Sequence, residues 1–341
     1  MRCVALPIVF LGCLSGCGGG DSESSTSAGE SSSSDSDAAT STTTSAGELS
    51  TGDGDAGDGD AGDGDAGDGD AGDGDGDGDG DGDLDCAELD GWQLVWCDPF
   101  TDPDIDPGKW AFEVNGQGGG NNELQYYTDR AENARIEDGK LVIEAHEEMF
   151  TGDDGTRDYT SARLRTFQLA QWTYGRIEVR ARLPIGQGMW PAVWMLPTDW
   201  VYGGWAASGE IDIMEMVGHD PAVSYGTLHY GGEWPANQSS GSNTAWGTHE
   251  YTLASGDFSE DFHVFAIEWE ADEFRWYVDG EHFQTQDNWY SDAAAFPAPF
   301  DQEFHLILNV AVGGTWPGSP DATTVFPQRM EVDWVRVYQP G

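Results

Sequence analysis

Apolar and polar side chains alternate along several runs of this chain, and this period of two constrains it to β-structure. Residues 175–183, 262–269 and 330–338 follow the alternation over their length. Successive side chains of a strand point to opposite faces, so each run can bury one face. No stretch of helical length shows a convincing amphipathic pattern. Many short strands separated by Gly, Pro and Asp turns predict an all-β sandwich of two antiparallel sheets.

These strands fall within residues 86–341, which are enough for one large domain with its own core. The whole chain has 63 Asp and Glu against 14 Lys and Arg, and a formal net charge of −49. Nucleic-acid binding requires a basic surface, so we expect no nucleic-acid partner. We expect the domain to be a monomer.

The segment before this domain, residues 18–85, has no Lys, Arg or aromatic residue. It begins rich in Ser and Thr and continues as a Gly-Asp-Ala repeat over residues 52–83. Such a composition cannot bury enough apolar surface to form a core, which predicts a disordered, self-repelling acidic linker. Loose cation binding is the alternative, because Asp-x-Asp-x-Asp-Gly resembles the start of a calcium loop, although the closing Glu is absent.

The first 17 residues predict an export signal. Met1 and Arg2 precede an apolar stretch, residues 3–14, that is too short to span a bilayer. Leu14-Ser15-Gly16-Cys17 resembles a bacterial lipobox, which implies cleavage before Cys17 and its lipidation. The chain would then be an exported cell-surface or outer-membrane lipoprotein, with the lipid as its only membrane contact. A plain secretory signal and a secreted protein are the alternative.

Two cysteines, Cys86 and Cys97, remain after the export signal. An exported chain meets an oxidising compartment, so we expect a disulfide between them. Two separate buried thiols are the alternative. Neither cysteine has a nearby His, which argues against a thiol nucleophile.

The run from Glu210 to Glu215, Glu-Ile-Asp-Ile-Met-Glu, places three carboxylates in an otherwise apolar strand. Glu210 and Asp212 share one face of a regular strand. Glu215 has an odd offset from Glu210 and reaches that face only if a β-bulge inserts one residue around Ile213-Met214. The sequence therefore predicts a bulged strand with all three acids on one side.

Three acids on one face raise one another's pKa, and no Lys or Arg lies between Ser208 and Tyr230 to neutralise them. Two carboxylates with separated pKa values are the requirement for glycoside hydrolysis. We therefore assign Glu210 as the nucleophile, Glu215 as the acid/base and Asp212 as a neighbour that hydrogen-bonds Glu210 and tunes its charge. A solvated acidic strand or a calcium site is the alternative.

The same run resembles the bulged active-site signature of glycoside hydrolase family 16, in its laminarinase-like form. The resemblance covers about residues 92–339 and implies a β-jelly roll with a concave substrate cleft. The segments that carry it, in family order, are NNELQYYT (121–128), YGRIEVR (174–180), GMWPAVWMLP (188–197), SGEIDIME (208–215), TLHY (227–230), WYVDG (276–280), LNVAVGGTWPG (308–318) and VDWVRVY (332–338).

The resemblance also implies which residues bind the sugar. Three tryptophans match residues that line the subsites nearest the catalytic acids, where flat sugar faces stack on aromatic rings. Core burial of these tryptophans is the alternative. Further matches are polar and would bond hydroxyls or orient the acids, with His229 pairing with Asp212 or a substrate hydroxyl. The implied residues are Trp190, Trp194, Trp316, Asn121 or Asn122, Arg163, His229 and Asn309.

Many members of the family carry a structural calcium ion far from the cleft. The resemblance matches Asp333 to its aspartate ligand, and the main-chain carbonyls of Pro99 and Gly139 to further ligands. Relatives commonly have Asp-Glu-Phe where this chain has Asp98-Pro99-Phe100, so a glutamate ligand is missing and the calcium stays open. We expect no cofactor for catalysis, and the absence of a His and Cys cluster disfavours zinc.

The resemblance thus implies a retaining endo-hydrolase of β-1,3-glucan. Related retaining hydrolases of mixed-linkage β-glucan or of agar-type galactan are alternatives that use the same acids. A non-catalytic glucan-binding surface protein and a calcium-dependent adhesin are alternatives of another class. The bulge disfavours the bulge-free relatives, and the scarcity of Lys and Arg disfavours a sulfated chain.

Overall fold

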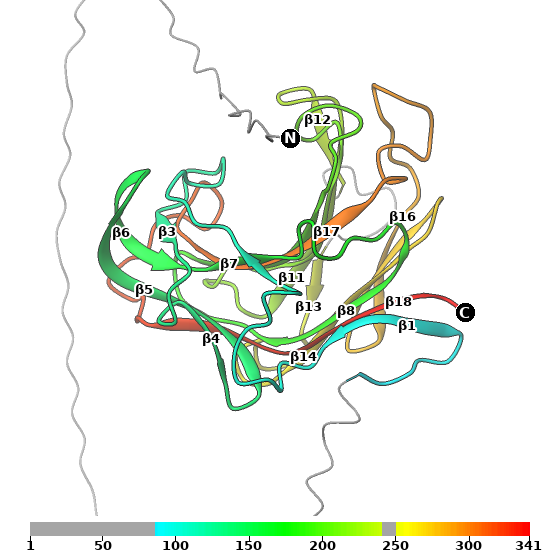
Figure 1. The fold of residues 1–341 in the computed structure, drawn as a ribbon. Helices are drawn as coiled ribbons and strands as arrows, with labels where there is room; N and C mark the ends of the chain where they lie inside the picture. Colours follow the sequence, from blue (N-terminus) through cyan, green and yellow to red (C-terminus); the bar gives the residue numbers. More distant parts are fainter. Residues whose placement is uncertain (1–85, 241–249) are drawn as a thin grey trace, which may run out of the picture. The chain divides into compact units, whose positions relative to one another are not determined.

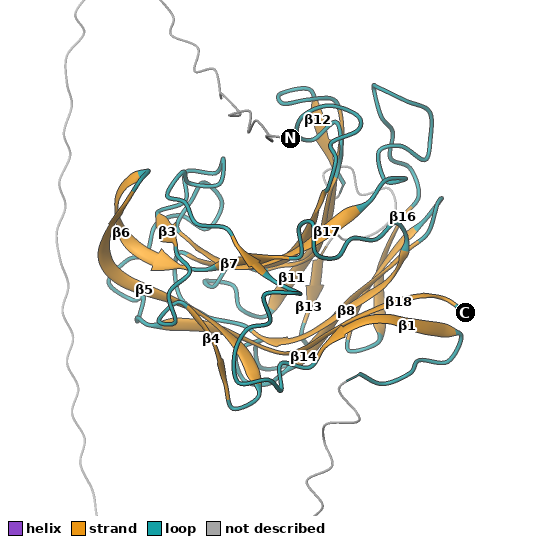
Figure 2. Cartoon of the chain, viewed as in Figure 1, coloured by secondary structure: helices purple, strands orange, loops and turns teal. Residues whose placement is uncertain are grey.

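The structure is a computed structural model, and it describes residues 86–240 and 250–341. Strands and loops make up this part of the chain and no helix occurs in it (Figure 2). Accordingly, no helix long and apolar enough to cross a membrane is found among the described residues. The predicted export signal, lipidated Cys17 and acidic linker lie outside the described residues.

A ten-stranded sheet forms one layer of the domain (Figure 1). Its path runs β16-β15-β14-β8-β18-β5-β6-β3, with β1 added beside β18 and β4 beside β5. The strands are β1 (Trp92–Asp98), β3 (Gln125–Tyr127), β4 (Ala134–Glu137), β5 (Lys140–Gly152), β6 (Gly155–Ser161), β8 (Gly175–Arg182), β14 (His263–Trp269), β15 (Phe274–Val278), β16 (Glu281–Gln286) and β18 (Gln328–Pro340).

An eight-stranded sheet forms the second layer, with the path β12-β11-β10-β9-β17-β7-β2 and β13 beside β11. Its strands are β2 (Ala111–Phe112), β7 (Arg163–Arg165), β9 (Met189–Pro197), β10 (Glu210–Glu215), β11 (Val223–Gly231), β12 (Asn237–Ser239), β13 (Glu250–Thr252) and β17 (Phe304–Val312).

The two layers confirm the predicted β-sandwich. The alternating runs of the sequence supply β8, β14 and β18, which lie next to one another in the ten-stranded sheet. One pairing differs from an all-antiparallel arrangement, because β3 lies parallel to β6. A tight hairpin joins only antiparallel strands, so the short β3 reaches the edge of this sheet through a longer connection.

The core lies between the sheets and takes one face of each strand. Ile177, Val179 and Ala181 of β8 are buried there, as are Leu306 and Leu308 of β17. Full burial of each large apolar side chain contributes about 1.5–3 kcal/mol relative to exposure. The opposite face of the eight-stranded sheet is thereby left to polar and aromatic side chains.

The start of the domain is tied to its last strand. β1 pairs with β18, and Cys97 of β1 forms a disulfide with Cys86. The two Cα atoms are 5.8 Å apart. The bridge closes a short loop at the beginning of the described domain.

Candidate active site

The central strand β10 has the predicted bulge. Against β11, Asp212 pairs with Thr227 while Glu215 pairs with Tyr225, so three steps on β10 face two on its neighbour. Against β9, the register shifts between Asp212 and Met214. Ile211, Ile213 and Met214 are buried, whereas Glu210 and Glu215 are partly exposed. We call the side of the sheet that carries Glu210, Asp212 and Glu215 the acidic face.

Residues from both sheets hold this bulge. The indole nitrogen of Trp276, on β15 of the other sheet, donates a hydrogen bond to the main-chain oxygen of Asp212 at 2.9 Å. Gly226 lies opposite the bulge on β11, and a Cβ atom there would come within 2.4 Å of the Trp276 ring. The lack of a side chain at Gly226 therefore admits the indole that fixes the bulge.

Tryptophans hold the two glutamates from different sides. Trp205 Nε1 donates to Glu210 Oε2 at 2.9 Å, and Trp190 Nε1 donates to Glu215 Oε1 at 2.9 Å. Trp205 comes from the loop that leads into β10, and Trp190 from β9. Each glutamate is thus oriented by one neutral donor.

His229 lies beside Glu210 on the adjacent strand β11. Its Nε2 atom is 3.2 Å from Asp212 Oδ2 and 3.6 Å from Glu210 Oε1, and its Nδ1 atom is 2.8 Å from the Ser239 hydroxyl oxygen. Asp212 Oδ2 has no hydrogen-bond partner among the described residues. The imidazole lies close to both carboxylates, and the direct bond between Asp212 and Glu210 stays a prediction.

Burial raises the pKa values of all three acids. Burial, followed by repulsion from Asp212, raises the pKa of both Glu210 and Glu215 to about 8. Burial also raises the pKa of Asp212 well above its usual range. Three carboxyl groups this close titrate as a unit, and the site holds fewer than three negative charges at neutral pH.

A row of side chains crosses the acidic face beside Glu215. Glu215 pairs with Ala192 on β9. Ala192 pairs with Asn309 on β17, and Asn309 pairs with Arg163 on β7. Ala192 contributes only a methyl group to this row. Trp194 Nε1 donates to Asn309 Oδ1 at 2.7 Å.

Arg163 stacks beside this row in a buried polar surrounding. Its guanidinium carbon lies 5.2 Å from the ring centre of Trp194 and 4.6 Å from that of Tyr127. Ion pairs join the guanidinium to Glu113 at 3.4 Å and to Glu123 at 3.8 Å. Arg163 therefore fixes the ring of Trp194 from one side.

The remaining predicted residues meet next to Glu215. The Trp316 ring lies edge-on to Trp190 at 5.4 Å and to Tyr225 at 5.1 Å, and Trp316 is 42% exposed. Asn121 and Asn122 are exposed in the loop beside it. The main-chain oxygen of Asn121 accepts a bond from the main-chain nitrogen of Thr315, and the Asn122 amide donates to the Thr315 hydroxyl at 3.3 Å.

The structure adds functional residues that the sequence reasoning missed. Trp205 bonds Glu210, Tyr225 borders Trp316, and Glu123 lies in the buried surrounding of Arg163. The position of Trp205, five residues before Glu210 and after two glycines, was a signal that could have found it. Tyr225 and Glu123 carry no such signal, because their partners, Trp316 and Arg163, are distant in sequence.

The three predicted calcium positions converge at one junction. Val332 of β18 pairs with β5 and Val335 with β1, so Asp333 lies between the strand ends that Gly139 and Pro99 adjoin. The Asp333 carboxylate, however, is paired with Arg180 and lies 3.9 Å from Lys140 Nζ. Calcium takes six to eight oxygen ligands. A carboxylate already neutralised by two cations fits it poorly, and the calcium stays a prediction.

Another arrangement brings metal-binding atoms together among the described residues. Ligand atoms of Glu210, Asp212 and His229 all lie within 4.8 Å of one another. These are the acids and histidine of the bulged strand and its neighbour. The same close grouping of two carboxylates and an imidazole suits acid–base chemistry.

The chain is similar to known proteins in sequence and in fold. The sequence model of the family described as "Glycosyl hydrolases family 16" matches residues 121–336. The chain is 47% identical over 260 residues to the beta-glucanase of Rhodothermus marinus, covering 73% of this chain and 85% of that protein. It is 44% identical over 267 residues to glucan endo-1,3-beta-glucosidase A1 of Niallia circulans, covering 73% of this chain but 38% of that longer protein.

Solved structures agree with the sequence matches. The laminarinase catalytic domain from Thermotoga maritima MSB8 superposes with a TM-score of 0.64 at 48% identity, covering 73% of this chain and 98% of that domain. Members of this family hydrolyse glycosides without a cofactor. The chain therefore belongs to glycosyl hydrolase family 16 and is a glycoside hydrolase.

Proposed function

We propose that this chain is a retaining endo-hydrolase of β-1,3-glucan with Glu210 as its nucleophile. The observation that carries the assignment is the asymmetric position of His229. The imidazole lies within 3.6 Å of Glu210 and Asp212, and no ion pair with Glu215 is found among the described residues. An imidazole N–H directed at a carboxylate favours the ionised form of that carboxylate. The proposed roles place the negative charge on the Glu210 side and the proton on Glu215.

This charge distribution matches the two steps of retention. Glu210 attacks the anomeric carbon, the bond to the leaving oxygen breaks, and Glu215 gives that oxygen its proton. Glu215, now ionised, takes a proton from water, and the water oxygen displaces Glu210 from the anomeric carbon. Trp190 donates to Glu215 in both protonation states, so the group keeps its orientation between the steps.

The substrate assignment rests on the aromatic surfaces and on the relatives. Trp190, Trp194 and Trp316 border the acids, and sugar rings stack on such surfaces. Two similar proteins are named for β-glucan or 1,3-β-glucan cleavage, and a similar structure is a laminarinase. A β-glucan polysaccharide is therefore the proposed partner.

The test compares laminarin, lichenan and agarose as substrates, with product sizes from chromatography and anomeric configuration from NMR. We expect fastest cleavage of laminarin, a ladder of oligosaccharides early in the reaction, and β-configured new reducing ends. Faster cleavage of lichenan would favour the mixed-linkage alternative, and faster cleavage of agarose the galactan alternative. α-Configured products would contradict retention.

We also propose that residues 1–85 act only in export and attachment, with Cys17 as the lipid anchor. The composition of residues 18–85 supports a passive spacer. A chain beginning at Leu84 should melt like the full chain, run as a monomer in gel filtration and cut laminarin at the same rate. Cys17→Ala should move the protein from the membrane fraction to the soluble fraction. A slower truncated enzyme would contradict the spacer role.

A further inference from the structure

Trp234 is an exposed tryptophan on the opposite side of β10 from Arg163, Trp194 and Asn309. It lies in the loop that joins β11 to β12, at the edge of the eight-stranded sheet (Figure 1). Arg163, Trp194 and Asn309 come from β7, β9 and β17, which follow β10 in the other direction. The acidic face thus has aromatic rings on both sides of its catalytic strand.

The Trp234 ring continues a line of aromatic surface that starts at the nucleophile. Trp205 donates to Glu210, and its ring centre is 5.5 Å from that of His229. The Trp234 ring centre lies 6.3 Å beyond Trp205, with 39° between the ring planes. The surface therefore extends from Glu210 outward toward β12.

Trp234 is held firmly although its side chain is 71% exposed. Its main-chain nitrogen donates to the Trp205 oxygen at 2.8 Å, and the neighbouring Glu233 accepts a bond from the Gly204 nitrogen at 2.7 Å. The loop is further joined to residue 292 by a bond from the Asp292 nitrogen to the Gly231 oxygen at 3.1 Å. Three loops thus fix the backbone while the indole face stays open, as a preorganised binding surface requires.

We propose that Trp234 is a sugar-stacking residue that holds glucan units on the β11–β12 side of the scissile bond. The proposal deepens the proposed function and rests on it. A chain that crosses the strands would contact Trp234 beyond Glu210 on the β11–β12 side, Trp194 on the β9 side, and Trp316 beside Glu215. Contacts on both sides hold an internal bond of the glucan between the acids, and endo-cleavage requires this position.

The test measures where laminarihexaose, labelled with ¹⁸O at its reducing end, is cut by the wild type and by Trp234→Leu. Leucine keeps apolar bulk against Trp205 but has no flat face. We expect kcat/KM for the hexaose to fall about tenfold through KM, with a shift of the preferred bond by at least one sugar unit. Trp316→Ala should shift the preferred bond in the opposite direction.

Trp234→Phe retains a flat ring and should restore the wild-type pattern, while melting temperatures of all three variants should stay near the wild type. Unchanged cleavage by Trp234→Leu, or a shift in the same direction as Trp316→Ala, would overturn the proposal. So would a large fall in melting temperature that lowers rates on all substrates equally. If the wild type leaves laminarihexaose intact, the proposed function fails instead.

Discussion

Seven acids of the ten-stranded sheet and the three acids of β10 lie in opposite electrostatic surroundings. On the ten-stranded sheet, acids are paired with arginine: Glu137 and Glu144 with Arg135, Glu148 with Arg130, Glu178 and Glu268 with Arg176, Glu331 with Arg182 and Asp333 with Arg180. On β10 of the eight-stranded sheet, the ion pairs found among the described residues join Glu210 and Asp212 to His229 alone. Arginine is absent from that group.

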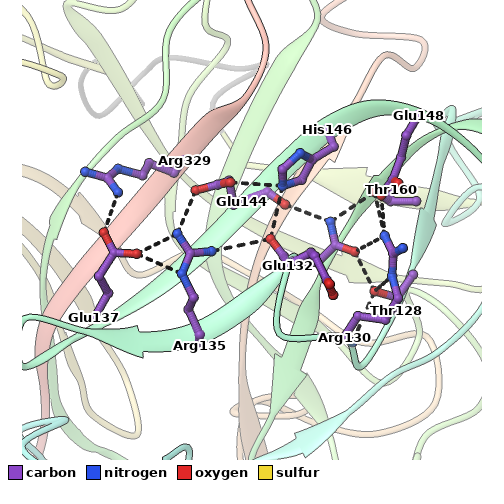
Figure 3. A network of polar contacts seen from close by, with 11 residues as sticks. Thr128, Arg130, Glu132, Arg135, Glu137, Glu144, His146, Glu148, Thr160 and Arg329 are labelled. Atoms are coloured by element: carbon purple, nitrogen blue, oxygen red, sulfur yellow. Dashed lines mark hydrogen bonds and ion pairs between the residues drawn. The ribbon is translucent and has the colours of Figure 1, made fainter. Parts of the chain in front are cut away.

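Figure 3 shows the first arrangement along β4, β5 and β6. Arg135 bridges Glu137 and Glu144, and Arg329 reaches Glu137 from β18 at 2.9 Å. Hydrogen bonds from Arg135 and Arg329 lower the pKa of Glu137, and a bond from Arg130 lowers the pKa of Glu148. These acids stay ionised at neutral pH, because their arginine partners favour the charged form.

An arginine partner decides whether an acid can take part in proton transfer. An acid paired with arginine is ionised throughout the ordinary pH range and cannot donate a proton. Glu210 and Glu215 have pKa values raised to about 8, so at neutral pH the site can hold both a proton and a charge. The lack of an arginine partner for the β10 acids lowers the stability of the fold. It also leaves these acids able to donate and accept protons.

The largest expected effect comes from removing the nucleophile. Glu210→Gln should lower turnover of laminarin by about 10⁴-fold or more, because no other carboxylate can form the glycosyl–enzyme bond. Glucan binding, measured by calorimetry, should stay near the wild type, and the melting temperature should not fall. Glu268→Gln on the ten-stranded sheet is the matched control and should retain full turnover. Comparable turnover loss in both variants would erase the distinction between the two groups of acids.

Removing the acid/base should have the next largest effect. Glu215→Ala should lower turnover of laminarin by about 10²–10⁴-fold, because the leaving oxygen is no longer protonated. Aryl glycosides with good leaving groups need little protonation and should be cut faster than laminarin by the variant. Azide should raise the rate further and yield a β-glycosyl azide. If neither change restores the rate, Glu215 has a structural role.

The layered fold and the bulge could be predicted from the sequence, because both depend on local periodicity. The period of two marks β8, β14 and β18, and the odd offset of Glu215 requires the extra residue of β10. The support of the bulge could not be predicted. Gly226 and Trp276 are distant in sequence, and their fit depends on how the two sheets face each other.

The candidate site, like the fold, could be predicted from the sequence only in part. The resemblance of short motifs indicated the acids, Trp190, Trp194 and Trp316, which the structure brings to one face. Trp205 and Trp234 lie on loops with no periodic pattern, so their approach to Glu210 and to each other depends on tertiary contacts. The pairing of Asp333 with Arg180 likewise depends on strand register rather than on local sequence.

A smaller effect, on stability alone, is expected on the ten-stranded sheet. Glu268 accepts bonds at 2.8 Å from Arg176, Arg275 and Tyr277, and its side chain is 15% exposed. Glu268→Gln leaves the arginines with an uncharged partner and should lower the free energy of unfolding by about 1–3 kcal/mol. Urea denaturation measures the loss. Asp272→Asn, at an exposed site, is the control and should change the free energy by less than about 0.5 kcal/mol.

The smallest effect, and the sharpest form of the comparison, is the pH dependence of these stability changes. Burial alone would raise the pKa of Glu268, but bonds from Tyr277 and Arg275 lower it. Its stabilising contribution is therefore present above the unfolded pKa, about 4.5, and is lost as pH falls below it. The deficit of Glu268→Gln should shrink on acidification.

The stability contribution of Glu215 depends on pH in the opposite direction, because its folded pKa is raised to about 8. The folded state favours the protonated form, so the advantage is complete below about pH 4.5 and is lost as pH rises through 8. Glu215→Gln stays neutral throughout. Its melting temperature should match the wild type near pH 4.5 and exceed it increasingly toward pH 8, by about 2–4 °C for each kcal/mol.

Differential scanning calorimetry of Glu268→Gln and Glu215→Gln against the wild type, from pH 3.5 to 9, measures how each difference in melting temperature changes with pH. Slopes of the same sign would mean that the acids of β10 are as well compensated as those paired with arginine, and the basis for their reactivity would be lost.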